Sequence, residues 1–288
     1  MPLFPEKQIA QLVQMACVLE ACAPKPGNVN RGHDFSDTTL EDFLLSAIAI
    51  GPAFENATCA GVGRIILDAI TSTRRWVKPN TNLGMVLLFA PLVKACIGVS
   101  DGDRIRSNLQ VVLNSLTIED ARLAYAAIRG AQPGGLGTVV ESDVAEEPAI
   151  TLLQAMSLAQ DRDSIAREYV TGYEITFETG LPALKDALSR SGDISSAIVQ
   201  AYLTILSKVP DTLIARKKGL NASRMVSQMA AAVLDKEGIF SNEGQAALME
   251  MDRDLRDDGH LLNPGTTADI TAAAIFLALF SREFGIEP

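Results

Sequence analysis

The chain has 288 residues, of which 48% are hydrophobic, 21% charged and 5% aromatic. This composition is typical of a globular protein and excludes an intrinsically disordered chain. The formal net charge of −10 and the lack of a basic stripe argue against nucleic acid as a partner, although a nucleotide needs only a few local cations. Because aromatic residues are scarce, the core must consist mainly of Leu, Ile, Val, Ala and Met, which favours packed helices.

Several features bear on the cellular compartment. Residues 1–7 lack a basic region followed by an apolar run, so no secretion signal is expected. The most apolar stretch, residues 83–99, contains Pro91 and Lys94, and we expect a buried helix kinked near Pro91 rather than a membrane span. Four dispersed cysteines without a Cys-x-x-Cys pair indicate buried free thiols in a reducing compartment. The sequence therefore predicts a cytoplasmic protein.

Apolar residues recur with helical spacing along most of the chain. The expected helices are 6–22, 38–50, 61–76, 83–99, 101–114, 117–129, 149–160, 163–178, 181–190, 194–207, 212–235, 241–256 and 266–282. Residues 132–148 are the longest stretch without this spacing, and no alternating run is long enough to predict a strand. We therefore predict an all-α fold in which residues 1–288 form a single multi-helix domain, with polar loops converging on one site.

The first polar cluster is residues 24–34, where two prolines should end the first helix. Asn28 and the glycine before it tolerate a positive φ, so the backbone here could approach a ligand closely. Lys25 and Arg31 could hold an anion, and His33 is suited to proton transfer near neutral pH. An ordinary connection between two helices would explain the same residues about equally well.

A second cluster, Asn80, Thr81 and Asn82, directly precedes the apolar helix expected at residue 83. Helix N-termini present free N–H groups and a partial positive charge, so this position could bind a phosphate. Plain N-capping, which needs only one of the three residues, is the alternative.

The third cluster, residues 258–269, contains the only other histidine, His260. Thr266 and Asp269 fit a capping box for the last helix. Capping alone does not explain His260 and Thr267, so a functional role stays open for this cluster.

A fourth region runs from Arg129 to residue 147 and ends in several carboxylates. These could hold Mg²⁺ together with a triphosphate, although an acidic run is more often a solvated loop. The sequence lacks the phosphate-binding pattern Gly-x-x-x-x-Gly-Lys-Ser/Thr and the dinucleotide-binding pattern Gly-x-Gly-x-x-Gly after a strand. It also lacks the zinc-protease pattern His-Glu-x-x-His and the hydrolase pattern Gly-x-Ser-x-Gly. The sequence therefore argues against the common nucleotide-binding folds, the zinc proteases and the α/β hydrolases.

Taken together, these clusters resemble the triphosphoribosyl-dephospho-CoA synthase family of the CitG/MdcB type. The matching residues follow the family's order: Pro24–Gly27 with Arg31, His33 and Asp34; Asn80–Gly84; Arg129–Gly130; Asp211–Thr212; and Pro264–Asp269. The resemblance implies an all-helical transferase that uses ATP and 3′-dephospho-CoA. In that reaction the 2′-hydroxyl of dephospho-CoA attacks the ribose C1′ of ATP, adenine leaves, and the triphosphate stays on the product.

The resemblance also implies roles for individual residues. The residues expected to bind nucleotide or substrate are Lys25, Asn28, Arg31, Asn80, Thr81, Asn82, Arg129, Thr266 and Thr267. The expected catalytic residues are His33, Asp34 and Asp269, with Asp34 and Asp269 also as ligands of Mg²⁺. The expected partners are small-molecule substrates, without nucleic acid or membrane, and a homodimer stays open.

The sequence departs from the family pattern at several points. Ala131 follows Arg129-Gly130 where the family has Glu, and the segment between Arg31 and His33 is shortened. Residues 133–137 and 161–163 are similar to a separate branch from archaea and one-carbon-pathway bacteria. A triphosphoribosyl or phosphoribosyl transfer to another acceptor, for example in a one-carbon cofactor pathway, therefore stays open. So do an Mg²⁺-dependent hydrolase of N-glycosidic bonds and a non-catalytic nucleotide-binding protein.

Overall fold

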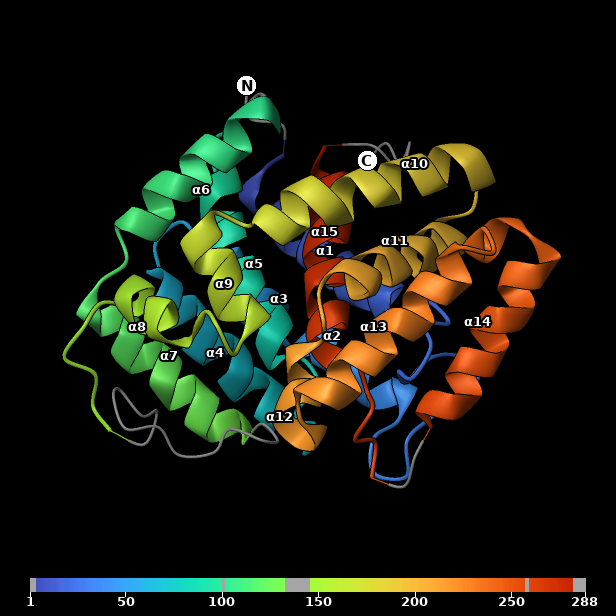
Figure 1. The fold of residues 1–288 in the computed structure, drawn as a ribbon. Coiled ribbons are helices and arrows are strands. Elements are labelled where there is room, and N and C mark those ends of the chain that lie inside the picture. Colours follow the sequence, from blue (N-terminus) through green and yellow to red (C-terminus); the bar gives the residue numbers. More distant parts are fainter. Residues whose placement is uncertain (1–3, 100–101, 133–145, 257–258, 282–288) are drawn as a thin grey trace. The chain divides into compact units, whose positions relative to one another are not determined.

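The computed structural model describes residues 4–99, 102–132, 146–256 and 259–281. These residues form helices joined by loops, without a strand among them (Figure 1). An isolated antiparallel bridge joins Asn30 to His33. The predicted all-α fold class is confirmed.

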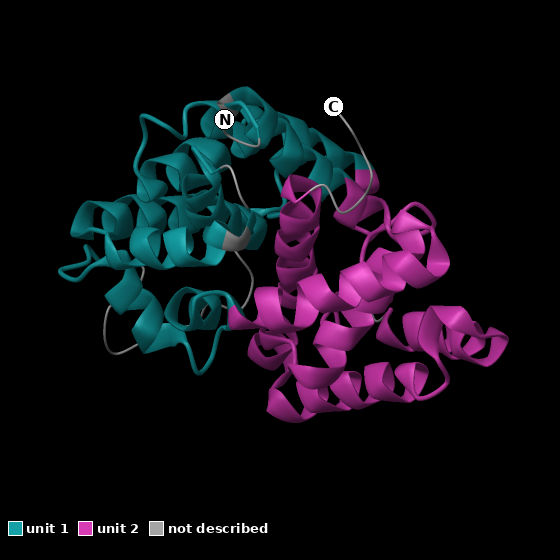
Figure 2. Ribbon diagram, turned by 90° about the horizontal axis from the view of Figure 1, so that it is seen from above, with its two compact units in different colours: residues 1–18, 41–173 teal, residues 19–40, 174–288 magenta. Residues whose placement is uncertain are grey.

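The chain divides into two compact units (Figure 2). The first comprises Met1–Val18 and Glu41–Tyr173, and the second comprises Leu19–Leu40 and Glu174–Pro288. The prediction of a single domain over residues 1–288 stays a prediction.

The helices of the first unit surround a buried central helix, α5. Its elements are α1 (Glu6–Cys22, as far as residue 18), α2 (Leu40–Ala49), α3 (Gly51–Glu55), α4 (Val62–Arg74), α5 (Leu83–Cys96), η1 (Gly102–Arg104), α6 (Ile105–Asn114), α7 (Ile118–Ala131), α8 (Leu152–Ala159) and α9 (Ser164–Thr171). Apolar residues cover nearly all sides of α5, which packs against α4, α6, α7 and α9. A helix that is apolar all round is expected to be buried in this way.

Pro91 lies inside α5 as predicted, and a tyrosine compensates for the backbone bond that it removes. Because proline has no N–H, the carbonyl of Leu87, four residues earlier, lacks its helical donor. The Tyr169 hydroxyl donates to that oxygen at 2.6 Å, and the Tyr173 hydroxyl donates to the Leu88 carbonyl at 2.9 Å. Burial raises the pKa of both phenols.

The second unit is built around α11 and α15. Its elements are η2 (Thr176–Gly180, a π-helical turn), α10 (Leu181–Ser191), α11 (Ile194–Lys208), α12 (Thr212–Lys218), α13 (Leu220–Leu234), η3 (Gly238–Phe240), α14 (Asn242–Leu255) and α15 (Gly265–Phe280). Nearly every residue of α15 is buried, and this helix packs against α10, α11 and α12. The unit also contains residues 19–40, which include the end of α1 and the first polar cluster.

Two predicted helices are interrupted in the structure. The helix expected at 163–178 stops at Thr171, because Gly172 and Tyr173 adopt φ values of 66° and 61°. The helix expected at 212–235 is split by Gly219, whose φ is 91°. A residue with positive φ commonly ends a helix, and apolar spacing alone does not reveal it.

Two further predictions concern the cysteines and a membrane-spanning helix. All four cysteines are free; Cys17 and Cys96 are buried, Cys22 is half-buried and Cys59 is exposed. The prediction that the thiols are buried is therefore wrong for Cys59. Among the described residues, no helix is both long enough and apolar enough to cross a bilayer.

Candidate functional site

The first polar cluster forms the loop between α1 and α2, residues 23–39, which we call the opening loop. It belongs entirely to the second unit. Residues 23–30 are buried except for Pro24, and we call them the buried half. Residues 31–37 are exposed except for Phe35, which is half-buried, and we call them the exposed half.

Lys25 lies in the buried half and forms an ion pair with Glu20 at the end of α1. The distance from Lys25 Nζ to Glu20 Oε1 is 2.9 Å, and the two side chains are 1% and 3% exposed. The ammonium group also donates to the carbonyls of Ala23, at 3.2 Å, and of Glu20. Burial raises the pKa of the Glu20 carboxyl, and the charge of Lys25 opposes this shift. This placement favours a role for Lys25 in holding the loop; its binding of phosphate stays a prediction.

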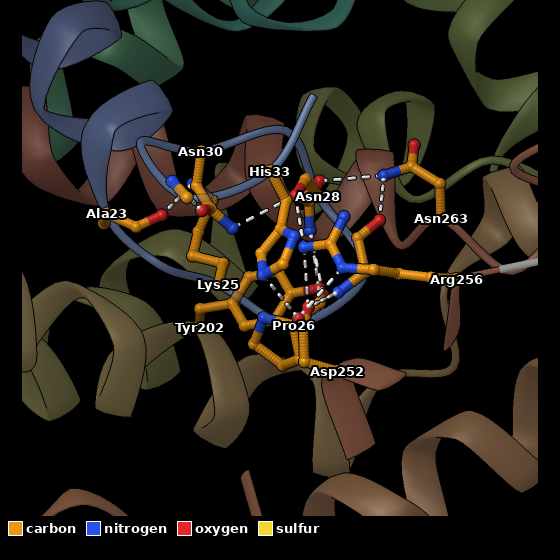
Figure 3. Close-up of polar contacts among 12 residues, drawn as sticks. Ala23, Lys25, Pro26, Asn28, Asn30, His33, Tyr202, Asp252, Arg256 and Asn263 are labelled. Atoms are coloured by element: carbon orange, nitrogen blue, oxygen red, sulfur yellow. Dashed lines mark hydrogen bonds and ion pairs between the residues drawn. The ribbon is translucent and has the colours of Figure 1, made fainter. Parts of the chain in front are cut away.

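Asn28 is held by two residues from distant parts of the second unit (Figure 3). Its Nδ2 donates to the Tyr202 hydroxyl at 2.8 Å, and that hydroxyl donates to the Pro26 carbonyl at 3.0 Å. Asn263 Nδ2 donates to Asn28 Oδ1 and to the Gly27 carbonyl, both at 2.9 Å. Burial raises the pKa of the Tyr202 phenol well above its ordinary value. The side chain of Asn28 is therefore engaged within the protein.

Gly27 brings the loop backbone into close contact with α14. Its φ is 73°, and its N–H donates to Asp252 Oδ1 at 2.9 Å. A Cβ at this position would lie 3.0 Å from the Leu255 side chain and 3.1 Å from Pro264. Both the dihedral angle and the contact distance therefore require glycine.

Asp252 lies in the last turn of α14, Arg256 is the C-cap residue four positions later, and both contact the opening loop. Arg256 Nε donates to Asp252 Oδ2 at 2.9 Å, and Arg256 Nη2 donates to Asp252 Oδ1 at 2.8 Å. Arg256 Nη2 also donates to the Asn28 carbonyl at 3.1 Å. The same Oδ2 lies 3.9 Å from His33 Nε2. Figure 3 draws these side chains together.

His33 and Arg31 belong to a tight turn in the exposed half. The backbone N–H of Asn30 donates to the His33 carbonyl at 2.9 Å, and the His33 N–H donates back to the Asn30 carbonyl at 3.1 Å. Asn30 Oδ1 also accepts the Gly32 N–H at 2.9 Å. The turn leaves the His33 side chain 56% exposed and Arg31 exposed. Both residues can therefore reach a substrate in solution.

Asp34 is exposed, and its Oδ1 accepts the backbone N–H of Leu40, the first residue of α2, at 2.8 Å. Asp269 is half-buried in α15. Within the described residues, no group of three His, Cys, Asp or Glu side chains is placed to hold a metal ion. A magnesium ion here would depend on one or two carboxylates together with substrate oxygens, which is its common arrangement in nucleotide sites.

The third cluster meets the opening loop within the second unit. The His260 ring stacks on the Phe35 ring with a centroid separation of 3.7 Å. The backbone of His260 has a positive φ of 53°. His260 Nε2 lies 3.4 Å from the Ser36 backbone N and 3.9 Å from Asp37 Oδ1. With the contacts of Asn263, these interactions show that two of the predicted clusters lie together.

The capping box expected from Thr266 and Asp269 is wrong. The helix α15 begins at Gly265, with Pro264 at the N-cap and without a side-chain cap from that residue. Thr266 therefore lies inside the first turn, where its hydroxyl is 3.3 Å from the Thr212 hydroxyl.

Asp211, which is 1% exposed, takes over the capping of α15. Its Oδ2 accepts the backbone N–H and the hydroxyl of Thr267 at 2.7 and 2.8 Å. Its Oδ1 accepts the N–H groups of Leu213 and Ile214 at 2.8 and 3.1 Å. One carboxylate thus caps two helices, α12 and α15. Burial raises the pKa of the Asp211 carboxyl, and these hydrogen bonds oppose the shift.

The second cluster lies in the first unit, at the start of α5. Asn80 is exposed, and its Oδ1 accepts the N–H of the first residue of α5 at 3.2 Å. The Thr81 hydroxyl is 2.6 Å from that of Ser46. Asn82 Nδ2 donates to Thr73 Oγ1 at 3.0 Å, and its buried Oδ1 has no hydrogen-bond partner in the described part of the chain. Asn80 therefore provides the helix cap.

Arg129 also lies in the first unit, as an exposed residue in the last turn of α7. Glu141 and Asp143 of the fourth cluster lie outside the described residues, whereas Glu146 and Glu147 are exposed. The predicted site residues are thus divided between the two units. The convergence of both sets on one site stays a prediction.

Sequence reasoning missed several residues that hold the opening loop: Glu20, Tyr202, Asp252 and Arg256. The spacing of Asp252 and Arg256 was a signal, since residues four apart on a helix can pair. Such pairs are common on solvated helix faces. The contacts with Gly27 and His33 are what distinguish this one.

Comparison with known proteins agrees with the predicted family. The family model described as ATP:dephospho-CoA triphosphoribosyl transferase matches residues 6–288. The chain belongs to this family. Since the family consists of transferases, the protein is an enzyme of that class.

Individual relatives match over nearly their whole length. A probable 2-(5''-triphosphoribosyl)-3'-dephosphocoenzyme-A synthase from Malonomonas rubra is 26% identical over 306 residues, covering 96% of this chain and 88% of the relative. The 2-(5''-triphosphoribosyl)-3'-dephosphocoenzyme-A synthase of Pectobacterium atrosepticum is 24% identical, covering 96% of this chain and 89% of the relative. A crystal structure from Archaeoglobus fulgidus, assigned to triphosphoribosyl-dephospho-CoA synthase, is 27% identical with a TM-score of 0.63 and covers 83% of this chain and 98% of that one.

Proposed function

We propose that this member of the CitG family transfers the triphosphoribosyl group of ATP to the 2′-hydroxyl of 3′-dephospho-CoA and releases adenine. The observation that carries the proposal is the family match over residues 6–288. The named synthases also match over 88% and 89% of their own length. In the reaction, the bond between the acceptor oxygen and C1′ forms, and the bond between C1′ and the adenine nitrogen breaks. Its electron pair leaves with adenine, which takes up a proton while the acceptor hydroxyl loses one.

The exposed half of the opening loop supplies the groups for these proton transfers. The transition state has positive charge on the ribose, and the enzyme must deprotonate the incoming hydroxyl and protonate the leaving base. His33 and Asp34 are adjacent and exposed, and they serve as the acid–base pair in this proposal. The turn at Asn30 holds the backbone of His33, and the Leu40 N–H donates to the Asp34 side-chain carboxylate.

Arg31 and magnesium neutralise the triphosphate in the proposed reaction. A triphosphate carries about four negative charges, so one or two side-chain cations leave most of them unbalanced. Arg31 is exposed, whereas the charge of Lys25 is already paired with Glu20. Asp269 would hold Mg²⁺ together with phosphate oxygens, with Asp34 as a further ligand if it does not serve in the acid–base pair, and the ion would supply the remaining positive charge. The predicted contacts of the triphosphate or ribose with Asn80, Thr81 and Asn82 complete this proposal.

A second candidate is the same transfer to a different acceptor. It is favoured by Ala131, which stands where the family pattern has Glu, and by an identity of only 24–26% to the named synthases. In either case the substrates are small molecules and the expected location is the cytoplasm. A homodimer stays a prediction, which sedimentation of the purified protein tests.

The deciding experiment is incubation of the purified protein with ATP, Mg²⁺ and 3′-dephospho-CoA, followed by mass spectrometry. We expect free adenine and a triphosphoribosyl adduct in equal amounts, and neither product when Mg²⁺ is chelated. Adenine without the adduct would contradict transfer to dephospho-CoA and indicate hydrolysis or transfer to another acceptor. If adenine never forms while ATP still raises the melting temperature, the protein binds the nucleotide without this chemistry.

A further inference from the structure

Asp252 has a contact with His33 that its hydrogen bonds to the rest of the protein do not explain. Its Oδ1 accepts two donors, the Gly27 N–H and Arg256 Nη2, whereas Oδ2 accepts Arg256 Nε alone among the described residues. A carboxylate oxygen has room for about two hydrogen bonds. Oδ2 therefore keeps room for a further donor, and His33 Nε2 lies 3.9 Å from it.

The carboxylate is held in this orientation by the protein. The Asp252 and Arg256 side chains are each 20% exposed, and the two hydrogen bonds between them are of the fork type that fixes both planes. The Gly27 N–H adds a third donor from the opening loop itself. Rotating Asp252 away from His33 would break these three bonds, so the carboxylate is a preorganised acceptor.

His33 is held on its backbone and left free at its other ring nitrogen. The paired backbone hydrogen bonds with Asn30 place the Cα of His33. Among the described residues, Nε2 faces Asp252 and no hydrogen bond reaches Nδ1. A neutral imidazole donates from one nitrogen and accepts at the other, and the partner of the first decides which one accepts.

We propose that Asp252 is a positioning residue for His33: it accepts the proton on Nε2, fixes this tautomer and aims Nδ1 at the substrate. Arg256 and the Gly27 N–H hold the carboxylate for this task. The separation of 3.9 Å closes to a hydrogen bond in the complex with substrate, since catalytic hydrogen bonds are commonly longer before substrate binds. The inference rests on the proposed function, in which His33 belongs to the acid–base pair.

The first test reads the tautomer directly by nitrogen NMR of the imidazole rings in the presence of ATP. The chain contains two histidines, so the spectrum is simple and His260→Gln assigns His33. We expect His33 in the wild type to carry its proton mainly on Nε2, and Asp252→Asn to shift the ring toward the other tautomer. Asp254→Asn, an exposed carboxylate on the same helix, is the matched control and should leave the ring unchanged. An unchanged tautomer in Asp252→Asn would overturn the inference.

The second test is a double-mutant cycle on adenine release. Asp252→Asn should lower kcat about 10²-fold with the KM for ATP changed less than about threefold, because positioning acts on the proton transfer. In a His33→Asn background, the same change should have almost no further effect. Equal losses in both backgrounds would assign Asp252 a purely structural role. Asp252→Glu keeps the charge, so its kcat should be higher than that of Asp252→Asn. It takes the place of Asp252→Asn in the cycle if that variant does not fold.

The two tests separate this inference from the proposed function. If the wild type releases no adenine, the proposed function fails, but the tautomer of His33 still shows whether Asp252 orients the ring. If adenine is released and the tautomer does not depend on Asp252, the function stands and the positioning role is wrong.

Discussion

The two halves of the opening loop contain similar residue types in different surroundings. In the buried half, Lys25 and Asn28 have all their polar contacts inside the second unit. In the exposed half, Arg31, His33 and Asp34 are open to solvent, and backbone hydrogen bonds hold the turn beneath them. Charged and amide side chains that look equally suited to a ligand thus divide into a buried set that holds the loop and an exposed set that is open to solvent.

The difference has a physical cause. A buried charge or amide must have its partner within the protein, since leaving it unpaired costs several kcal/mol. The same group at the surface is solvated and free to exchange water for substrate. We therefore expect changes in the buried half to lower the free energy of unfolding, and changes in the exposed half to lower activity at nearly constant stability.

The largest effect on stability is expected from Lys25→Met. The change leaves the Glu20 carboxylate buried without its cation, which typically costs about 3–5 kcal/mol of the free energy of unfolding. Urea unfolding measures the loss. The double variant Glu20→Leu with Lys25→Met should recover most of it. Arg31→Met, a matched cation in the exposed half, should change stability by about 0.5 kcal/mol or less. Equal losses at the two positions would contradict the division.

Alkaline pH should destabilise the protein through its buried phenols. Burial raises the pKa of Tyr169, Tyr173 and Tyr202 in the folded state, so the unfolded chain loses these protons first as the pH rises. Stability is therefore full below the unfolded pKa of about 10 and falls above it by about 1.4 kcal/mol per pH unit for each phenol. Urea unfolding between about pH 9 and about pH 11 measures the slope. Tyr202→Phe should lower the slope of the free energy of unfolding against pH by the contribution of one phenol. An unchanged slope would show that Tyr202 ionises in the folded protein.

At neutral pH, Tyr202→Phe tests the anchor of the buried half. The change removes a hydroxyl that donates to the Pro26 carbonyl and accepts from Asn28, and we expect a loss of about 1–2 kcal/mol in the free energy of unfolding. The effect should be smaller in an Asn28→Ala background, because the two groups share a hydrogen bond. Full additivity of the two losses would mean that this bond does not stabilise the loop.

The smallest effect on stability, with a large effect on activity, is expected for Asp34→Asn. Asparagine keeps an oxygen that can accept the Leu40 N–H, so the free energy of unfolding should change by about 0.5 kcal/mol or less. Adenine release should fall by about 10²-fold or more, because the variant loses an acid–base group. The two measurements are urea unfolding and product analysis on the same preparation. A matching loss of stability would instead assign Asp34 to the scaffold.

The amino-acid sequence determined the features that depend on near neighbours. Helical spacing predicted the all-α fold and most helix positions, because apolar residues three and four apart share one face. The capping box of Thr117 and Asp120 formed as its spacing predicts, with the two residues bonded reciprocally. The polar clusters were sufficient to predict the family, and the family match over residues 6–288 confirms that prediction.

Only the tertiary structure decided which polar residues form the scaffold and which stay open to substrate. Asp252 meets the opening loop 225 positions away along the chain, and Tyr202 meets it 176 positions away. Asp211, and not the local pair Thr266 and Asp269, caps α15, since packing gives this buried carboxylate four donors from two helices. Such contacts have no period in the sequence. They arise when packing brings distant helices together and every buried polar group must find a partner.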